Sequence, residues 1–202
     1  MNDAGSLLRK SERGVFSLYA RSGERKYINA AERRLFVEAA NQSDVVTRAF
    51  CLTLLYTGCR LSEALKLTTD GVQGDVSVIA IHSLKKRQRH LIREVPVPKF
   101  VVEAIQHASA SGSMALQHDH RIWQWKRTWA WMRVKAVMAD AGIVGIHATP
   151  KGLRHGFGVH AIHTGVPLNL VQKWLGHAQM STTAIYTNAV GPEERAIAQR
   201  MW

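Results

Sequence analysis

Apolar residues recur along this chain mainly at the three- and four-residue spacing that places them on one face of a helix. After Asp44, the residues Val45, Ala49 and Leu52 follow this spacing, and Gly58 then interrupts it. Asp44 can cap the start of this helix, and glycine is common just past a helix end. Similar patterns predict helices at 29–41 (with a capping box of Asn29 and Glu32), from Pro98 to about 108, at 121–141, from 153, and at 167–176, 181–188 and 192–200.

Two segments have the apolar and β-branched character of strands instead. They run from Val76 to Ile81 and from Leu91 to Val97, on either side of a cationic run. This arrangement predicts an antiparallel hairpin with a basic tip that can contact phosphate. The tip consists of Lys85, Lys86, Arg87, Gln88 and Arg89. The predicted fold class is therefore mainly α with a small antiparallel β-sheet.

The predicted helix at 121–141 combines aromatic and cationic residues. Trp125, Trp129 and Met132 share one face, which we interpret as part of the core. The residues between them either follow a DNA backbone or form a solvated basic face. These cations are Lys126, Arg127, Arg133 and Lys135.

The chain has 202 residues, of which 46% are apolar, and this is enough for one packed domain at 29–202. Residues 1–28 are rich in Arg, Lys, Ser and Gly without a sustained period, so they predict a flexible basic arm. This arm either lies on DNA or acts as a solubilising tail. Residues 109–113, with the sequence SASGS, predict a linker between two helices.

The formal net charge of +12 indicates a polyanionic partner. Nucleic acid is the usual one, while binding to ribosomes or to a membrane surface fits the charge equally well. Cys51 and Cys59 have no metal-ligand spacing and are interpreted as reduced core thiols of a cytoplasmic protein. His118 and His120 lack further ligands at a recognisable spacing, so we expect no metal. We find no signal peptide and no stretch that could span a bilayer.

The residues from Thr149 to Tyr186 contain groups that suit chemistry on a phosphodiester. Arg154 can hold two phosphate oxygens with its planar guanidinium, and it lies off the apolar stripe of its predicted helix. His177, placed in a turn after Gly176, can donate a hydrogen bond to a developing charge. The Tyr186 hydroxyl can attack phosphorus once its proton is withdrawn. These groups predict a phosphotyrosine product.

These motifs resemble the C-terminal signature of the tyrosine recombinases, the integrase family of DNA-rearranging enzymes. The resemblance is carried by Leu153-Arg154-His155, by Leu175-Gly176-His177, and by the Thr-x-x-Tyr sequence that ends at Tyr186. Upstream, residues 56–63, with the sequence YTGCRLSE, resemble the family's first arginine motif. The resemblance covers the chain from about residue 28 to its C-terminus.

The resemblance implies a catalytic-domain fold of this family, and a mechanism that uses neither a metal nor another cofactor. DNA is joined to the tyrosine through a 3′-phosphate and a 5′-hydroxyl is freed. Arg60 and Arg154 would clamp the phosphate, His177 would stabilise the transition state, and Tyr186 would be the nucleophile. The family also carries a hairpin lysine that protonates the leaving 5′-oxygen; Lys85 is our choice and Lys86 the alternative. The last residue of the candidate catalytic set is Lys151. The chain departs from the family's motif there, because most members carry a histidine at this position.

We interpret the chain as a site-specific DNA recombinase acting on double-stranded DNA. The alternatives are a type IB topoisomerase, which shares these groups, and a DNA-binding regulator derived from a recombinase. About 28 residues cannot form the family's separate DNA-clamping domain, so the chain resembles the minimal recombinases or a catalytic domain cut from a longer protein. The resemblance also implies assembly into dimers or tetramers on DNA through the C-terminal helix, with Ala196, Ile197 and Met201 on its apolar face.

Overall fold

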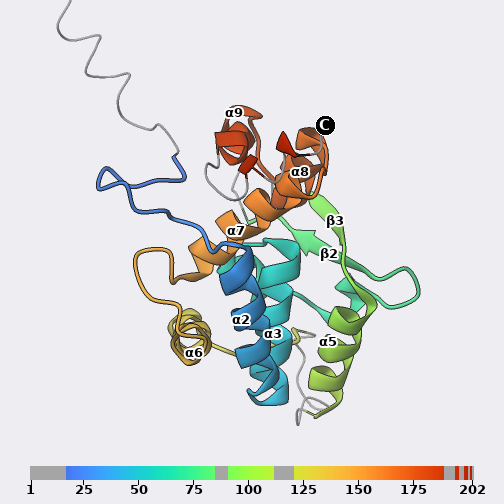
Figure 1. Cartoon of the computed structure of the whole chain (residues 1–202). Helices are drawn as coiled ribbons and strands as arrows, with labels where there is room; N and C mark the ends of the chain where they lie inside the picture. The colour runs from blue at the N-terminus through green and yellow to red at the C-terminus, as the bar shows by residue number, and fades with distance from the viewer. Residues whose placement is uncertain are drawn as a thin grey trace, which may run out of the picture.

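The computed structural model describes residues 17–84, 91–111, 121–188, 194–195, 198–199 and 201. This part of the chain is mainly helical and contains one small sheet (Figure 1). The helices are α2 (Ala30–Asn41), α3 (Val45–Thr57), α4 (Leu61–Ala64), α5 (Lys99–Ser111), α6 (Arg127–Asp140), α7 (Pro150–His163), α8 (Leu168–Leu175) and α9 (Ser181–Ala184), with two short 3₁₀ helices, η1 (Thr69–Gly71) and η3 (Ile185–Asn188). The strands are β1 (Val72–Gln73), β2 (Val78–His82) and β3 (Ile92–Pro96).

The helix ends follow the capping residues that the sequence contains. Asn29 and Glu32 form the predicted capping box at the start of α2. Asp44 accepts a hydrogen bond from a backbone N–H in the first turn of α3. Gly58 ends α3 in the left-handed conformation, with φ of 60°. Arg60 consequently lies in the turn directly before α4.

Helix α3 lies at the centre of the core. It packs against α2, α5 and α7, and Figure 1 shows α7 crossing over the ends of α2 and α3. Phe50 of α3 meets the buried Trp123 edge to face, with ring centroids 5.0 Å apart. Cys51 and Cys59 are buried free thiols, as expected. The turn after α3 is also held against α7, because the Gly58 carbonyl accepts a hydrogen bond from Arg154 and Gly58 lies against the ring of Phe157.

The sheet is antiparallel with the strand order β1-β2-β3. Ile79 of β2 pairs with Val95 of β3, so the predicted hairpin is confirmed. Strand β1 was not predicted, because two residues are too few to show an alternating pattern. Residues alternate inward and outward along β3, and Arg93 lies on the buried side with Val95. The predicted basic tip, Lys85, Lys86, Arg87, Gln88 and Arg89, lies outside the described residues.

Residues 17–28, which the sequence analysis assigned to a flexible arm, pack against the rest of the structure. Leu18, Tyr27 and Ile28 are all buried. Ile28 lies so close to Gly156 of α7 that an added Cβ on this glycine would meet it at 2.5 Å. The folded part therefore extends upstream of residue 29, because these scattered apolar residues cover α7 without forming a periodic pattern.

Helix α6 differs from its prediction in where it begins and in which face it buries. Residues 121–126 are not helical, because this segment pairs with the chain before η1: the Ile122 N–H donates to the Leu67 carbonyl over 2.9 Å. The prediction that Trp129 and Met132 belong to the core is wrong, because their side chains have exposed fractions of 49% and 50%. The buried stripe of α6 consists instead of Ala130, Val134, Val137 and Met138.

The predicted linker at 109–113 and the predicted C-terminal helix at 192–200 are only partly covered by the described residues. Residues 109–111 belong to the last turn of α5, so the first half of the predicted linker is wrong; residues 112–113 lie outside the described part. The predicted C-terminal helix at 192–200 also lies largely outside it, with Ala196 and Ile197, while Met201 is exposed. Among the described helices, none has the length and apolar character needed to cross a bilayer.

Candidate active site

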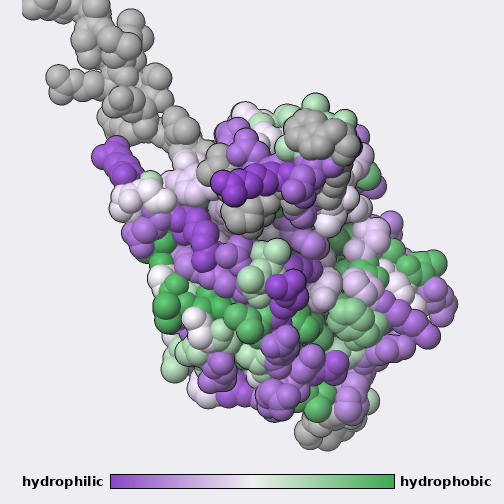
Figure 2. All heavy atoms as spheres, in the orientation of Figure 1, coloured by the Kyte–Doolittle hydropathy of each residue, from purple (hydrophilic) through white to green (hydrophobic). Residues whose placement is uncertain are grey.

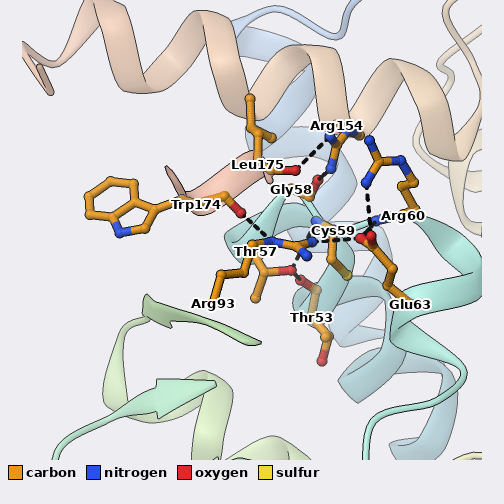
Figure 3. Close-up of polar contacts among 10 residues, drawn as sticks. All are labelled: Thr53, Thr57, Gly58, Cys59, Arg60, Glu63, Arg93, Arg154, Trp174 and Leu175. Carbon is orange, nitrogen blue, oxygen red and sulfur yellow. Dashed lines mark hydrogen bonds and ion pairs between the residues drawn. The ribbon is translucent and has the colours of Figure 1, made fainter. Parts of the chain in front are cut away.

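Arg154 links the two turns that carry the other candidate residues. Thr149 caps α7 and Pro150 occupies its first turn, so Arg154 lies one turn into the helix. Its Nη1 donates to the Gly58 carbonyl over 2.7 Å and its Nη2 donates to the Leu175 carbonyl over 2.8 Å (Figure 3). These bonds fix the guanidinium plane before any substrate arrives. Arg154 therefore both holds the two turns together and contributes its charge to the candidate site.

Arg60 is held by Glu63, one turn further along. Glu63 accepts a hydrogen bond from the Arg60 backbone N–H over 2.9 Å, and its carboxylate forms an ion pair with Arg60 Nη1 at 2.8 Å (Figure 3). Burial acts to raise the pKa of Glu63, but Arg93 and Arg60 outweigh it and hold the pKa below its ordinary value. Arg60 thus pairs with Glu63 and still reaches the site, since its side chain stays about one third exposed.

Arg93 is a site component that the sequence analysis missed. Its side chain is 3% exposed, its Nη2 lies 2.5 Å from Glu63, and its Nε donates to the Trp174 carbonyl over 2.7 Å (Figure 3). It thereby joins β3, the turn of Arg60 and the end of α8. Period-two alternation with Val95 could have placed Arg93 on the buried face, but nothing nearby in sequence identifies its partner, 30 residues away.

His177 follows the end of α8, as predicted. Gly176 adopts the left-handed conformation with φ of 65°, and the chain then turns towards α9. The Nδ1 atom of His177 lies 2.9 Å from the Thr183 hydroxyl. Its ring stacks on that of Tyr186 with an interplanar angle of 14° and a centroid distance of 6.2 Å. The turn therefore orients the imidazole beside the candidate nucleophile.

Tyr186 lies in η3 and only 1% of its surface is exposed. Its ring rests on Gly158 of α7, where an added Cβ would lie 2.6 Å from the ring. Its hydroxyl lies 3.2 Å from Nδ1 of His155. His155 was predicted only as part of a motif, and its contact with Tyr186 across α7 and η3 makes it a second site residue that was not predicted.

The electrostatics of these buried groups set their protonation at neutral pH. Burial raises the pKa of Tyr186 to about 12, although Arg154 and Arg60 act to lower it. Burial, followed by the charges of Lys151 and Arg154, lowers the pKa of His155 to about 4. Burial also lowers the pKa of Arg154 to about 10, and Arg60 contributes to that shift. At pH 7 the hydroxyl is therefore protonated, the imidazole of His155 is neutral, and Arg154 keeps its charge.

The candidate residues surround one cleft with a volume of about 890 Å³. Arg60, Arg154, His177 and Tyr186 all line it, although they come from four separate segments. Lys151, at the exposed start of α7, lines it as well. With Arg127, the cleft thus gathers four cations, two histidines and a phenolic hydroxyl, a set that suits a phosphodiester.

Other predicted residues lie elsewhere or cannot be placed. Arg127, predicted to bind DNA, lines the cleft, whereas Lys126 is exposed before α6 and is not among its lining residues. Lys85, Lys86, Arg87 and Arg89 lie outside the described residues. In the part of the chain that the structure describes, no three His, Cys, Asp or Glu residues form a group that could hold a metal ion.

Comparison with known proteins identifies relatives along most of the chain. Residues 26–191 match the model of the phage integrase family. A tyrosine recombinase XerD from Corynebacterium glutamicum is 31% identical over 176 residues, which cover 82% of this chain and 58% of that protein. The chain spans about half the length of the curated relatives that it matches.

Solved structures show the same fold. The crystal structure of the XerA recombinase superimposes with a TM-score of 0.77 at 25% identity, covering 87% of this chain and 64% of that one. The XerH site-specific recombinase, solved as a pre-cleavage complex with its difH substrate, gives a TM-score of 0.71 at 20% identity, with 91% and 59% covered. With the family match and the XerD relative, these likenesses show that the chain belongs to the phage integrase family, the family of the tyrosine recombinases.

Proposed function

We propose that this chain is the catalytic domain of a site-specific DNA recombinase that cuts and rejoins DNA through a 3′-phosphotyrosine. The observation that carries the proposal is the cleft, in which Arg60, Arg154, His177 and Tyr186 meet although they lie far apart in sequence. The relatives support it, since XerD, XerA and XerH are named as recombinases. The binding of a difH substrate by XerH suggests double-stranded DNA as the partner here too.

The proposed reaction begins with the scissile phosphate between Arg60 and Arg154. Their guanidinium groups neutralise the charge that grows on the non-bridging oxygens, and His177 donates a hydrogen bond to one of them. The Tyr186 oxygen attacks phosphorus as the bond to the 5′-oxygen breaks. The leaving oxygen takes its proton from Lys85 of the basic hairpin, in our proposal, or from Lys86. Attack by the freed 5′-hydroxyl of another strand then reverses these steps.

The proton of Tyr186 needs an acceptor, and the geometry offers His155. The neutral imidazole can accept a hydrogen bond at Nδ1 from the tyrosine hydroxyl when its own proton is on Nε2, over the observed 3.2 Å. We propose that this bond orients the hydroxyl, and that its proton passes to Nδ1 of His155 as the bond to phosphorus forms, since the phenolic proton becomes acidic only then. Lys151 lines the same cleft, and its charge adds to the attraction for phosphate.

We further propose that the chain assembles into dimers or tetramers on DNA through its C-terminal helix, and that residues 29–202 with the packed segment before them form the catalytic unit. Strand exchange between two DNA sites is the test that separates this recombinase from the alternatives. Exchange products from two labelled duplexes support the proposal. Relaxation of supercoils without exchange indicates a topoisomerase, and binding without any cleavage indicates a regulator.

Binding to DNA should weaken steeply as salt is added, because cations that contact phosphates release counterions from DNA. With roughly six phosphates contacted, we expect the affinity to fall by about a thousandfold between about 50 and 200 mM salt. Fluorescence anisotropy of a labelled duplex, measured across a salt series, gives the slope directly. An affinity that hardly changes with salt would argue against a DNA-binding cleft lined by these cations.

A methyl group placed under the nucleophile should slow cleavage without weakening DNA binding. In Gly158→Ala, the new Cβ would meet the Tyr186 ring at 2.6 Å, so the ring must move. A displacement of about 1 Å costs about 100-fold in rate. Alanine is favoured over glycine in a helix by about 1 kcal/mol, so loss of helix stability would not explain the effect. Rates of DNA-protein adduct formation, compared with affinity, provide the measurement; an unchanged rate would mean that the position of this ring is not critical.

A further inference from the structure

Trp131 of α6 is an exposed aromatic residue at the edge of the cleft. Its side chain is 42% exposed, and it lines the cleft together with Arg127, one helical turn earlier, and Ile146. Figure 2 shows hydrophobic side chains on the surface where α6 and the following loop lie, and Met132, Val144 and Ile146 are exposed there. Within the described residues, the clamp arginines and this apolar edge thus border the same space.

The ring of Trp131 is backed by an anchored cation. Lys135 Nζ lies 6.0 Å from the ring centroid and donates a hydrogen bond to the Ala148 carbonyl over 2.8 Å. This lysine is attracted to the ring of Trp131, while a large part of the side chain remains open to solvent. Such a ring loses little conformational entropy when a flat ligand stacks on it.

Trp129, two residues earlier, provides an internal comparison. It is also exposed, and its ring is also backed by a cation, because Arg133 lies 5.9 Å from the centroid and pairs with Asp44. Trp129 is not among the residues that line the cleft. The two tryptophans therefore share their helix, their exposure and a cationic neighbour, and they differ in whether they face the phosphate-binding groups.

We propose that Trp131 is a stacking platform for an unpaired DNA base next to the phosphate in the cleft, with Arg127 on the adjoining backbone. This inference rests on the proposed function, in which the strand end freed by cleavage must leave its duplex before it joins another. The cations that line the cleft select an anionic ligand, and the exposed indole selects one with a flat apolar face. A nucleotide has both properties, and base-on-aromatic stacking tolerates any sequence.

The experiment is a cycle of two protein forms and two single strands, carried out in the Tyr186→Phe background so that no cleavage occurs. One strand is an oligothymidylate of about twelve nucleotides, and the other has the same phosphates but abasic sugars throughout. We expect Trp131→Ala to weaken binding of the oligothymidylate about tenfold or more and to leave binding of the abasic strand unchanged. Trp131→Phe should restore most of the affinity, because it retains an aromatic face.

Trp129→Ala is the matched control and should change neither affinity. The inference is overturned if Trp131→Ala weakens both strands equally, if it weakens neither, if Trp129→Ala has the same effect, or if the parent protein binds the two strands equally well. Because this cycle measures binding alone, its result is independent of cleavage. Failure of the wild-type chain to form a covalent adduct would count against the proposed function and not against the stacking contact.

Discussion

Tyr186→Phe should abolish covalent attachment to DNA while leaving DNA affinity within a few-fold of the wild-type value. The substitution removes only the hydroxyl, which lies 3.2 Å from His155 and is the proposed nucleophile. The ring still fills the space over Gly158 and still stacks on His177, so the fold of the cleft should persist. The measurement is a denaturing gel of nicked suicide substrates, read for a DNA-linked protein band, beside anisotropy for affinity.

Tyr56→Phe is the matched control for this experiment. Tyr56 is a half-buried residue of α3 whose ring lies under Arg33, with 4.7 Å between the guanidinium carbon and the ring centroid, and it does not line the cleft. It should form the adduct at the wild-type rate. A DNA-linked band that persists in Tyr186→Phe would show that another residue attacks, and equal loss in both variants would indicate a general defect.

Arg154→Ala should slow attachment by about a hundredfold to a thousandfold. The guanidinium stabilises charge that develops mainly in the transition state, and loss of one such donor costs about 10² to 10³ in rate. The substitution also leaves the Gly58 and Leu175 carbonyls without their donor. A buried group left unpaired costs about 1 to 3 kcal/mol, so thermal stability should fall as well.

The loss of rate and the loss of stability can be separated by two further variants. Arg133→Ala removes an arginine that pairs with Asp44 outside the cleft, so it should affect stability without slowing attachment. Arg154→Lys keeps a charge but lacks the planar fork, so it should remain far slower than wild type. A rate for Arg154→Ala within a few-fold of wild type, measured in single turnover on folded protein, would refute the clamp role.

Much of the site could be predicted because its motifs lie next to helix ends that local chemistry defines. Gly58 and Gly176 end their helices where glycine permits a left-handed turn, and these turns place Arg60 and His177. In α7, Leu153 and Phe157 of the apolar stripe are buried, but Arg154, predicted to lie off this stripe, is buried as well. At the two helix ends the short-range pattern and the tertiary structure agree.

The remaining features depend on contacts between residues that are distant in sequence. Arg93 acquires its role from Glu63, and His155 from Tyr186, so neither could be recognised from local pattern alone. In α6 the core accommodates the stripe that includes Ala130, while Trp129 remains outside, although hydrophobicity favoured the larger residue. Periodicity identifies which residues share a face, whereas packing decides which face is buried.

The most direct test of the account is to identify the atoms that join protein and DNA. The adduct formed on nicked suicide DNA would be digested with protease and nuclease, and the modified peptide sequenced by mass spectrometry. We predict a phosphodiester between Tyr186 and a 3′-end, with a free 5′-hydroxyl on the other strand end that polynucleotide kinase can label. An adduct on another residue, a linkage to a 5′-end, or no adduct on DNA that the protein binds would contradict the account.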